Sequence, residues 1–131
     1  MLDFKFDWCA EMEIGNSLID TQHKQLFRLG RDIEQLVMCQ CIGVTTKQLL
    51  DIILEIREFV AYHFYEEEEL MKAYNYPKYQ VHKQKHNEAT QYILNIDCKK
   101  LGEHPYEMLR IHRDELQNWI FTHILVDDKD L

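Results

Sequence analysis

Apolar residues recur along this chain at the spacing of helix faces. The first stripe steps by 4, 3, 4, 3 and 4 positions through Ile19, His23, Leu26, Gly30, Ile33 and Val37. Steps of three and four place side chains on one face of an α-helix. Three further stripes with this period run through Ile52, Ile56, Phe59, His63, Glu67 and Leu70; Tyr79, His82, His86, Ala89, Ile93 and Ile96; and Leu109, His112, Leu116, Trp119 and His123. The pattern predicts four amphipathic helices, at about 18–40, 46–73, 78–100 and 105–126.

Short segments rich in Gly, Asn and Pro separate the stripes, at CIGVTT, YNYP and LGEHP. Candidate N-caps are Ser17 or Asp20 for the first helix and Thr45 or Thr46 for the second, and Pro105 suits the first turn of the last. Long helices joined by short connections favour an up-down-up-down packing. We therefore predict an all-α fold, an antiparallel four-helix bundle in one domain over 1–131, with an extended N-terminal arm.

Composition and charge narrow the class of protein further. Of the 131 residues, 46% are apolar and 29% charged, which is typical of a globular chain. The net charge of -8 argues against nucleic-acid binding, because phosphate neutralisation needs clustered Lys and Arg. The N-terminus lacks a basic region followed by an apolar one, and no apolar run approaches the roughly 18 residues of a membrane span. We expect a cytoplasmic protein with no nucleic-acid or membrane partner.

Four cysteines, Cys9, Cys39, Cys41 and Cys98, form no C-x-x-C pair. The spacing favours reduced, partly buried thiols, with a disulfide or a thiolate metal site as the alternatives.

Six polar residues occupy core positions of the stripes: His23, His63, Glu67, His82, His86 and His123. Burying such groups costs several kcal/mol unless they are paired, protonated or bound to a metal. A lone histidine such as His104 or His112 is more often a satisfied core residue. Two pairs are four residues apart, so both members lie on one face, one helical turn apart, and can reach a common ion.

These residues are predicted to lie at the same level along the bundle axis. At about 1.5 Å per residue, all six lie within roughly 13 Å of helix ends that an up-down-up-down bundle places together. Asp128 can join them if the last helix ends near it, as the polar tail DDKDL suggests. His112 lies about 16 Å from His123, nearer the start of the last helix, and should not belong to the cluster.

Five imidazoles and two carboxylates exceed the four ligands of a tetrahedral zinc. They suit two first-row transition ions with bridging carboxylates. The sequence has no H-E-x-x-H motif, which disfavours a zinc protease, and it lacks the paired Glu-x-x-His motifs of carboxylate-rich di-iron bundles.

Four stretches resemble the hemerythrin family, specifically its bacterial members: IDTQHKQLF, HFYEEEELM, YPKYQVHKQKH and WIFTHILVDD. Together they give His, H-x-x-x-E, H-x-x-x-H and H-x-x-x-x-D in the family order. The resemblance implies one iron held by His82, His86 and His123 and a second held by His23 and His63. It also implies bridges from Glu67, Asp128 and an oxo or hydroxo group, with an open position on the second iron.

Dioxygen would bind reversibly at that open position, so the resemblance implies a carrier, storage or sensing protein and not an enzyme. Trp119 and Ile124 are candidates for the apolar dioxygen pocket, although core packing alone also explains Trp119. Relatives often have a bulky aromatic where this chain has Ala89, and a smaller side chain there can open a void.

Two other functions remain open at this point. One is a di-iron enzyme that reduces dioxygen, peroxide or nitric oxide, and the other is a metal-free helical interaction module. A sensing role would need a separate redox or signalling protein partner.

Within the run Glu66–Glu69, helical rotation separates the four side chains. Glu67 follows His63 by one turn and is the predicted ligand, whereas Glu66 and Glu69 point about 100° and 200° away from it and should be solvated. Glu68 fits a place either on the helix surface or behind the metal ligands.

Overall fold

The computed structural model describes residues 8, 10–123 and 128, and every regular element in that part of the chain is a helix. The elements are η1 (Ala10–Met12), α1 (Ser17–Met38), α2 (Thr46–Ala73), α3 (Tyr79–Leu94), α4 (Cys98–Glu103) and α5 (Pro105–Thr122). Most residues of the predicted N-terminal arm lie outside the described residues.

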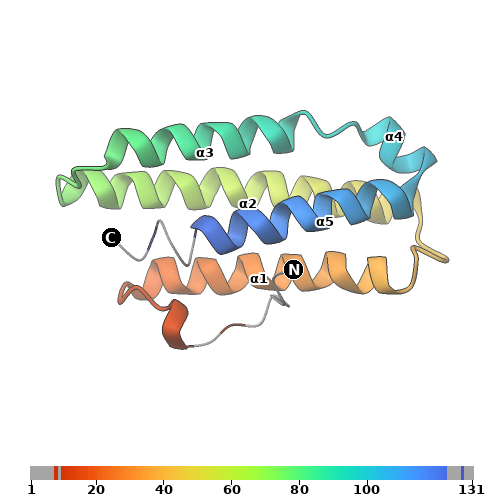
Figure 1. Cartoon of the computed structure of the whole chain (residues 1–131), viewed down its shortest axis with the longest axis horizontal. Helices are drawn as coiled ribbons and strands as arrows, with labels where there is room; N and C mark the ends of the chain where they lie inside the picture. The colour runs from red at the N-terminus through yellow and green to blue at the C-terminus, as the bar shows by residue number, and fades with distance from the viewer. Residues whose placement is uncertain (1–7, 9, 124–127, 129–131) are drawn as a thin grey trace.

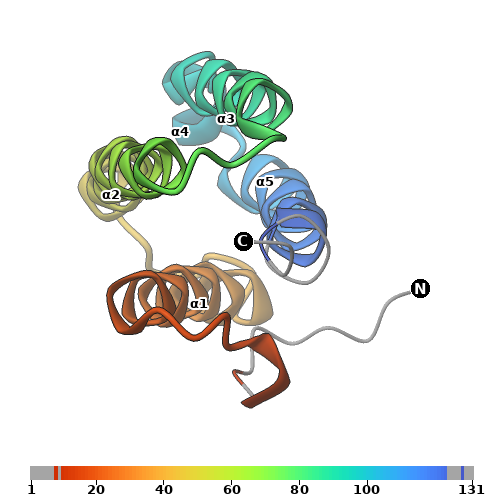
Figure 2. The same ribbon diagram turned by 90° about the vertical axis from the view of Figure 1, so that its left-hand side faces the viewer.

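Four long helices, α1, α2, α3 and α5, run alternately up and down as an antiparallel bundle (Figure 1). Viewed end-on, they follow one another around the bundle axis in chain order (Figure 2). The α2–α3 connection lies at the left end of Figure 1, and the α1–α2 connection and α4 lie at the right end. The predicted fold class is confirmed.

Local sequence explains where the long helices begin. Asn16, and neither Ser17 nor Asp20, caps α1 by accepting a hydrogen bond from the backbone N–H of Ile19. Thr45 caps α2 in a reciprocal capping box with Gln48. Pro105 opens α5, where its missing N–H has no helical partner to lose.

The third predicted helix, 78–100, differs from the structure because it divides into two. Helix α3 ends at Leu94, and the short helix α4 begins after Asp97. The Asp97 side chain accepts a hydrogen bond from the Lys100 backbone N–H, which offers the chain a new helix start in place of continuation. The break leaves α3 shorter than its neighbours.

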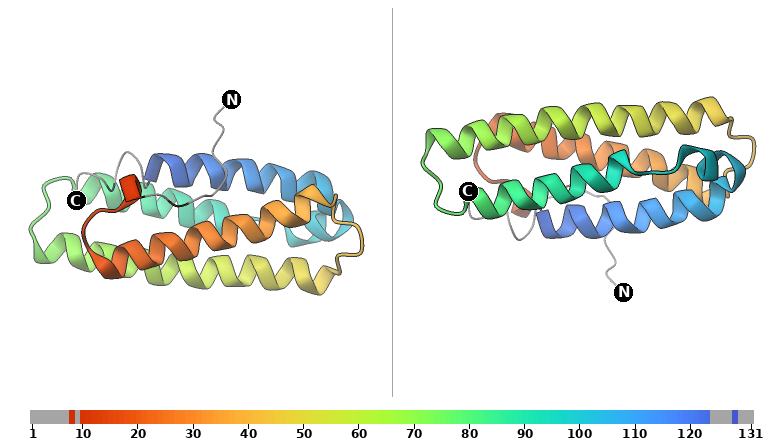
Figure 3. Two further views of the ribbon diagram at one scale, coloured as in Figure 1. Left: turned by 90° about the horizontal axis from the view of Figure 1, so that it is seen from below. Right: turned by 90° about the horizontal axis from the view of Figure 1, so that it is seen from above.

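The apolar core extends from α4 to Phe64 and Trp119, whose rings stack on imidazoles of the polar cluster. Leu29, Ile33, Ile53, Leu101 and Leu109 are at most 2% exposed and belong to one apolar cluster toward the end where α4 lies. A smaller cluster, formed by Met12, Leu26, Phe27 and Ile120, joins η1, α1 and α5. Two further views show how the four helices surround this interior (Figure 3).

The described cysteines are free thiols: Cys39 is exposed, Cys41 buried and Cys98 half-buried. Cys9 lies outside the described residues. Among the helices of the described chain, none combines the length and the apolar character needed to cross a membrane.

Candidate metal centre

Seven polar side chains are buried together inside the bundle. Their exposed fractions are 0% for His23, His63, Glu67 and Asp128, 2% for His86, 3% for His123 and 4% for His82. They come from α1, α2, α3, the residue that ends α5, and position 128. The structure thus brings together all seven residues that the sequence nominated as ligands, and their role as ligands stays a prediction.

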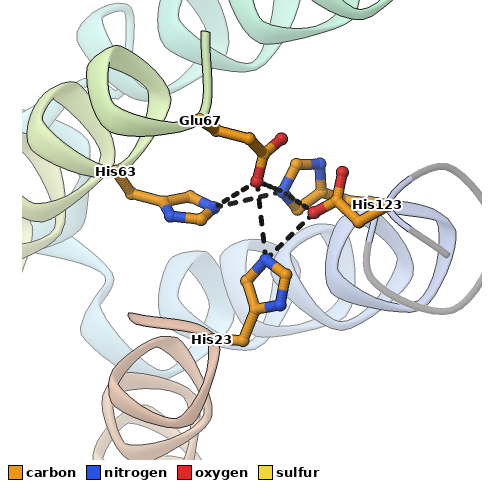
Figure 4. A group of neighbouring side chains, drawn as sticks. His23, His63, Glu67 and His123 are labelled. Atoms are coloured by element: carbon orange, nitrogen blue, oxygen red, sulfur yellow. Dashed lines mark hydrogen bonds and ion pairs between the residues drawn. The ribbon is translucent and has the colours of Figure 1, made fainter. Parts of the chain in front are cut away.

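Atoms able to bind a metal form two groups, in each of which they lie within 4.8 Å of one another. One group contains His23, His63, Glu67, His123 and Asp128, and the other contains Glu67, His82 and His86. Figure 4 shows His23, His63 and His123 converging on the Glu67 carboxylate from different sides. Glu67 belongs to both groups.

Each carboxylate spans the two groups. Glu67 Oε1 lies 3.1 Å from His86 Nε2, whereas its Oε2 lies 3.2 Å from His63 Nε2. Asp128 Oδ2 lies 2.9 Å from His23 Nε2, and its Oδ1 lies 3.8 Å from His82 Nδ1. Carboxylates with one oxygen toward each set of imidazoles have the geometry of bridging ligands.

His123 lies between the sets. Its ring centroid is 5.4 Å from that of His63 and 5.4 Å from that of His86. Its Nε2, however, is 3.2 Å from His63 Nε2 and 2.8 Å from Asp128 Oδ2, which places that atom in the first group. The resemblance had assigned His123 to His82 and His86, and the division of ligands between two ions stays a prediction.

The donor atoms at the centre fit a bound cation. Glu67 Oε2, both Asp128 oxygens and His23 Nε2 are buried without a hydrogen-bond partner in suitable geometry among the described residues. Such groups cost free energy unless another species satisfies them. Imidazole nitrogens and carboxylate oxygens facing one point are ligands that first-row transition ions accept.

Electrostatics lead to the same conclusion. Burial opposes protonation of His123, but Asp128 and Glu67 outweigh it and raise its pKa to about 10. Burial likewise opposes protonation of His23, yet the same two carboxylates raise its pKa. Burial would raise the pKa of Glu67, and the surrounding imidazoles instead hold it well below its usual range. The two carboxylates therefore stabilise positive charge at the centre, and a metal ion can supply that charge in place of the protons on the imidazoles.

His63 differs from these two imidazoles, because burial dominates and lowers its pKa. Its neutral ring is held by Gln22: Nδ1–H donates to Gln22 Oε1 at 2.7 Å, and both side chains are buried. This hydrogen bond leaves the Nε2 lone pair of His63 directed at the centre.

Glu68 holds the His86 ring by a hydrogen bond, as Gln22 holds that of His63. The distance from His86 Nδ1 to Glu68 Oε2 is 3.0 Å, and the Glu68 side chain is 18% exposed. With Nδ1–H donating, His86 Nε2 is free to face the centre. The open question about Glu68 is thereby answered: it lies behind a candidate ligand.

Its neighbours behave differently. Glu69 is exposed and pairs with Lys72 at 3.4 Å, whereas Glu66 is half-buried and thus less solvated than the sequence predicted.

Aromatic rings cover the imidazoles. Phe64 stacks on His86 with ring centroids 4.0 Å apart, and Trp119 stacks on His123 at 4.3 Å. Phe59 lies parallel to His63 at 5.8 Å. These apolar faces limit the access of water to the centre.

Two buried residues, Gln22 and Ile120, were not singled out by the sequence analysis, although Gln22 carried a signal. Gln22 lies three residues after Ile19 and four before Leu26, so it shares their inward face. Ile120 is 0% exposed and packs with Trp119 beside the α1–α5 contact. The predicted pocket residue Ile124 lies outside the described residues.

His112 stands apart from the cluster, as its position along the chain predicted. It accepts or donates a hydrogen bond at Nδ1 with the Tyr92 hydroxyl, 2.7 Å away, and burial lowers its pKa.

An antiparallel helical bundle with buried imidazoles and carboxylates that could hold a metal ion is typical of metal-binding bundle proteins. Residues 15–131 match the sequence model of the "Hemerythrin HHE cation binding domain". The chain belongs to the hemerythrin family.

Individual relatives agree over most of the chain. It is 27% identical to a bacteriohemerythrin of Clostridium acetobutylicum over 125 residues, 95% of this chain and 97% of the relative. It is 24% identical to a bacteriohemerythrin of Aquifex aeolicus, covering 86% and 83%. A hemerythrin-like protein of Naegleria gruberi is 28% identical, covering 94% and 87%.

Proposed function

We propose that this protein binds dioxygen reversibly at two iron ions held inside the bundle. One observation carries the proposal: five imidazoles and two carboxylates, all nearly inaccessible to solvent, converge within one apolar interior. Two ferrous ions would supply the electrons that dioxygen takes up on binding and returns on release. Storage, delivery and sensing are all compatible uses, and sensing would require a separate protein partner.

The proposed ligand roles follow the resemblance. His82, His86 and His123 would hold one iron and His23 and His63 the other, while Glu67 and Asp128 would act as shared ligands, with an oxo or hydroxo group between the ions. The bridging roles are supported by the two oxygens of each carboxylate, which face different sets of imidazoles. A set with one protein ligand fewer leaves room for dioxygen.

Reversibility depends on the residues around the ions. A histidine-rich set supplies less negative charge than a carboxylate-rich one, so high-valent iron is less stabilised and binding is favoured over oxidation of other molecules. Water and free protons would promote loss of reduced oxygen, and the stacked rings of Phe59, Phe64 and Trp119 cover one face of His63, His86 and His123 with apolar surface. Trp119 is the described residue that we assign to the dioxygen pocket.

An optical experiment tests the proposal. The protein is reduced without air, exposed to dioxygen and then returned to an inert atmosphere while its visible charge-transfer bands are followed. We expect bands that appear with dioxygen and disappear on its removal. An immediate and permanent ferric spectrum would contradict reversible binding, and a well-folded protein purified without any transition metal would exclude the site itself.

A second candidate is an enzyme that reduces dioxygen, peroxide or nitric oxide at the same ions. It is favoured by a cavity of ≈ 470 Å³ that includes both Ala89 and His123 in its lining, since a reductant could approach the centre through it. Catalytic turnover with a reductant present distinguishes it, because a carrier takes up dioxygen only in proportion to the protein.

A further inference from the structure

A cavity of ≈ 470 Å³ opens between α2, α3 and α5, on the side where Figure 3 (right) shows α3 and α5 running next to each other. Its apolar lining includes Val60, Phe64, Ala89, Ile93, Leu116 and Trp119. Along α5 its lining extends from Leu109 to His123, a distance of about 21 Å. The cavity is therefore a long apolar site that begins beside the candidate metal centre.

Ala89 is the smallest side chain in the cavity lining. It occupies the inward face of α3 between His86 and Ile93, where a larger side chain would reach toward α5. Near the far end, the Tyr92 hydroxyl and His112 Nδ1 form a hydrogen bond of 2.7 Å that links α3 to α5. This hydrogen bond connects the two helices that border the cavity.

The charged residues around the cavity disfavour an anionic ligand. Glu88 and Glu115 line it together with one cation, Lys85, and the whole chain has a net charge of -8. An anion would meet these carboxylates, and any ion would lose its hydration against the apolar walls. His112 adds no charge, because burial favours its neutral form. Neutral apolar molecules are the ligands that such a surface accepts.

We propose that the cavity between α3 and α5 binds a neutral, apolar organic molecule about the size of naphthalene, seated against Trp119. Its volume lies within the roughly 300–1,000 Å³ typical of small-molecule sites. Trp119 stacks on His123 at 4.3 Å, and both side chains line the cavity, so a bound molecule would lie beside a candidate metal ligand. This binding does not depend on dioxygen and can be tested separately from it.

The test uses two probes of equal size, 2-naphthalenemethanol and 2-naphthoate, titrated by calorimetry into the protein as purified. We expect the neutral alcohol to bind with one site per chain and the anion to bind at least about tenfold more weakly, because its carboxylate must be desolvated. Absence of binding by the alcohol, or equal binding of both probes, would overturn the proposal.

Two substitutions on α3 locate the site. Ala89→Phe fills the cavity and should weaken binding of the alcohol by at least about tenfold. Asn87→Phe places the same ring on the exposed face of α3, outside the cavity lining, and should leave the affinity unchanged. If Ala89→Phe disturbs folding by circular dichroism, the smaller change Ala89→Leu replaces it.

Equal affinities of the Ala89 and Asn87 variants would place the probe elsewhere and refute the assignment. A second chain is the competing occupant. Concentration-dependent dimerisation that Ala89→Phe abolishes would give the cavity to that second copy and likewise overturn the small-molecule proposal.

Discussion

Replacing Glu68 by Ala removes the acceptor that holds His86 in place. The pair is short, 3.0 Å between His86 Nδ1 and Glu68 Oε2, and His86 is only 2% exposed. Hydrogen bonds to charged groups contribute about 1.5–3 kcal/mol. Because the Glu68 side chain is 18% exposed, solvent screening reduces this contribution, and we expect about 1–2 kcal/mol. That loss corresponds to roughly 5- to 30-fold weaker metal binding.

The measurement is ferrous iron affinity by anaerobic competition with a chelator. Glu68→Gln keeps an oxygen that can accept from Nδ1–H, so it should lose less affinity than Glu68→Ala. Glu69→Ala is the matched control, because that neighbour is exposed and pairs only with Lys72 among the interactions described above. Equal affinities of Glu68→Ala and Glu69→Ala would refute the positioning role.

Three other outcomes follow from the same structure. Glu67→Ala should be purified with little iron while Glu69→Ala keeps it, as metal analysis will show; equal loss would overturn the assignment of Glu67. In the metal-free protein, the pKa of His123 is raised to about 10, so the folded state retains a proton that the unfolded chain releases above about 6.5. Its free energy of unfolding in urea should therefore fall as the pH rises through that interval, and a flat profile would contradict the raised pKa. Leu109→Ala, at a 0% exposed core position, should lower that free energy by about 2–5 kcal/mol without weakening iron binding.

The sequence predicted the convergence of the site because helical periodicity fixes both the face and the depth of a side chain. His63 and Glu67 share a face and stand one turn apart, so their meeting needs no knowledge of tertiary contacts. The same reasoning separated Glu67 from Glu69. It also separated His112 from His123, since eleven residues of helix carry the former beyond reach.

Periodicity could not settle features that depend on contacts between helices. Glu68 borders the inward stripe, and only the position of His86 on α3 decides what it contacts. The contact of Gln22 could not be predicted either, because it depends on where α2 places His63. The division of the third helix depended on competition at Asp97 between capping and continuation, which a stripe of apolar residues does not record.

An ion held by His23 and Asp128 would tie together positions 105 residues apart and would also attach α2 through His63 and Glu67. Any excursion that peels one helix from the bundle would then break the coordination, because no single segment carries the whole ligand set. Metal retention would therefore report whether the helices that carry the ligands remain packed together. Slow iron loss from an otherwise soluble preparation would report opening of the bundle well before aggregation or proteolysis did.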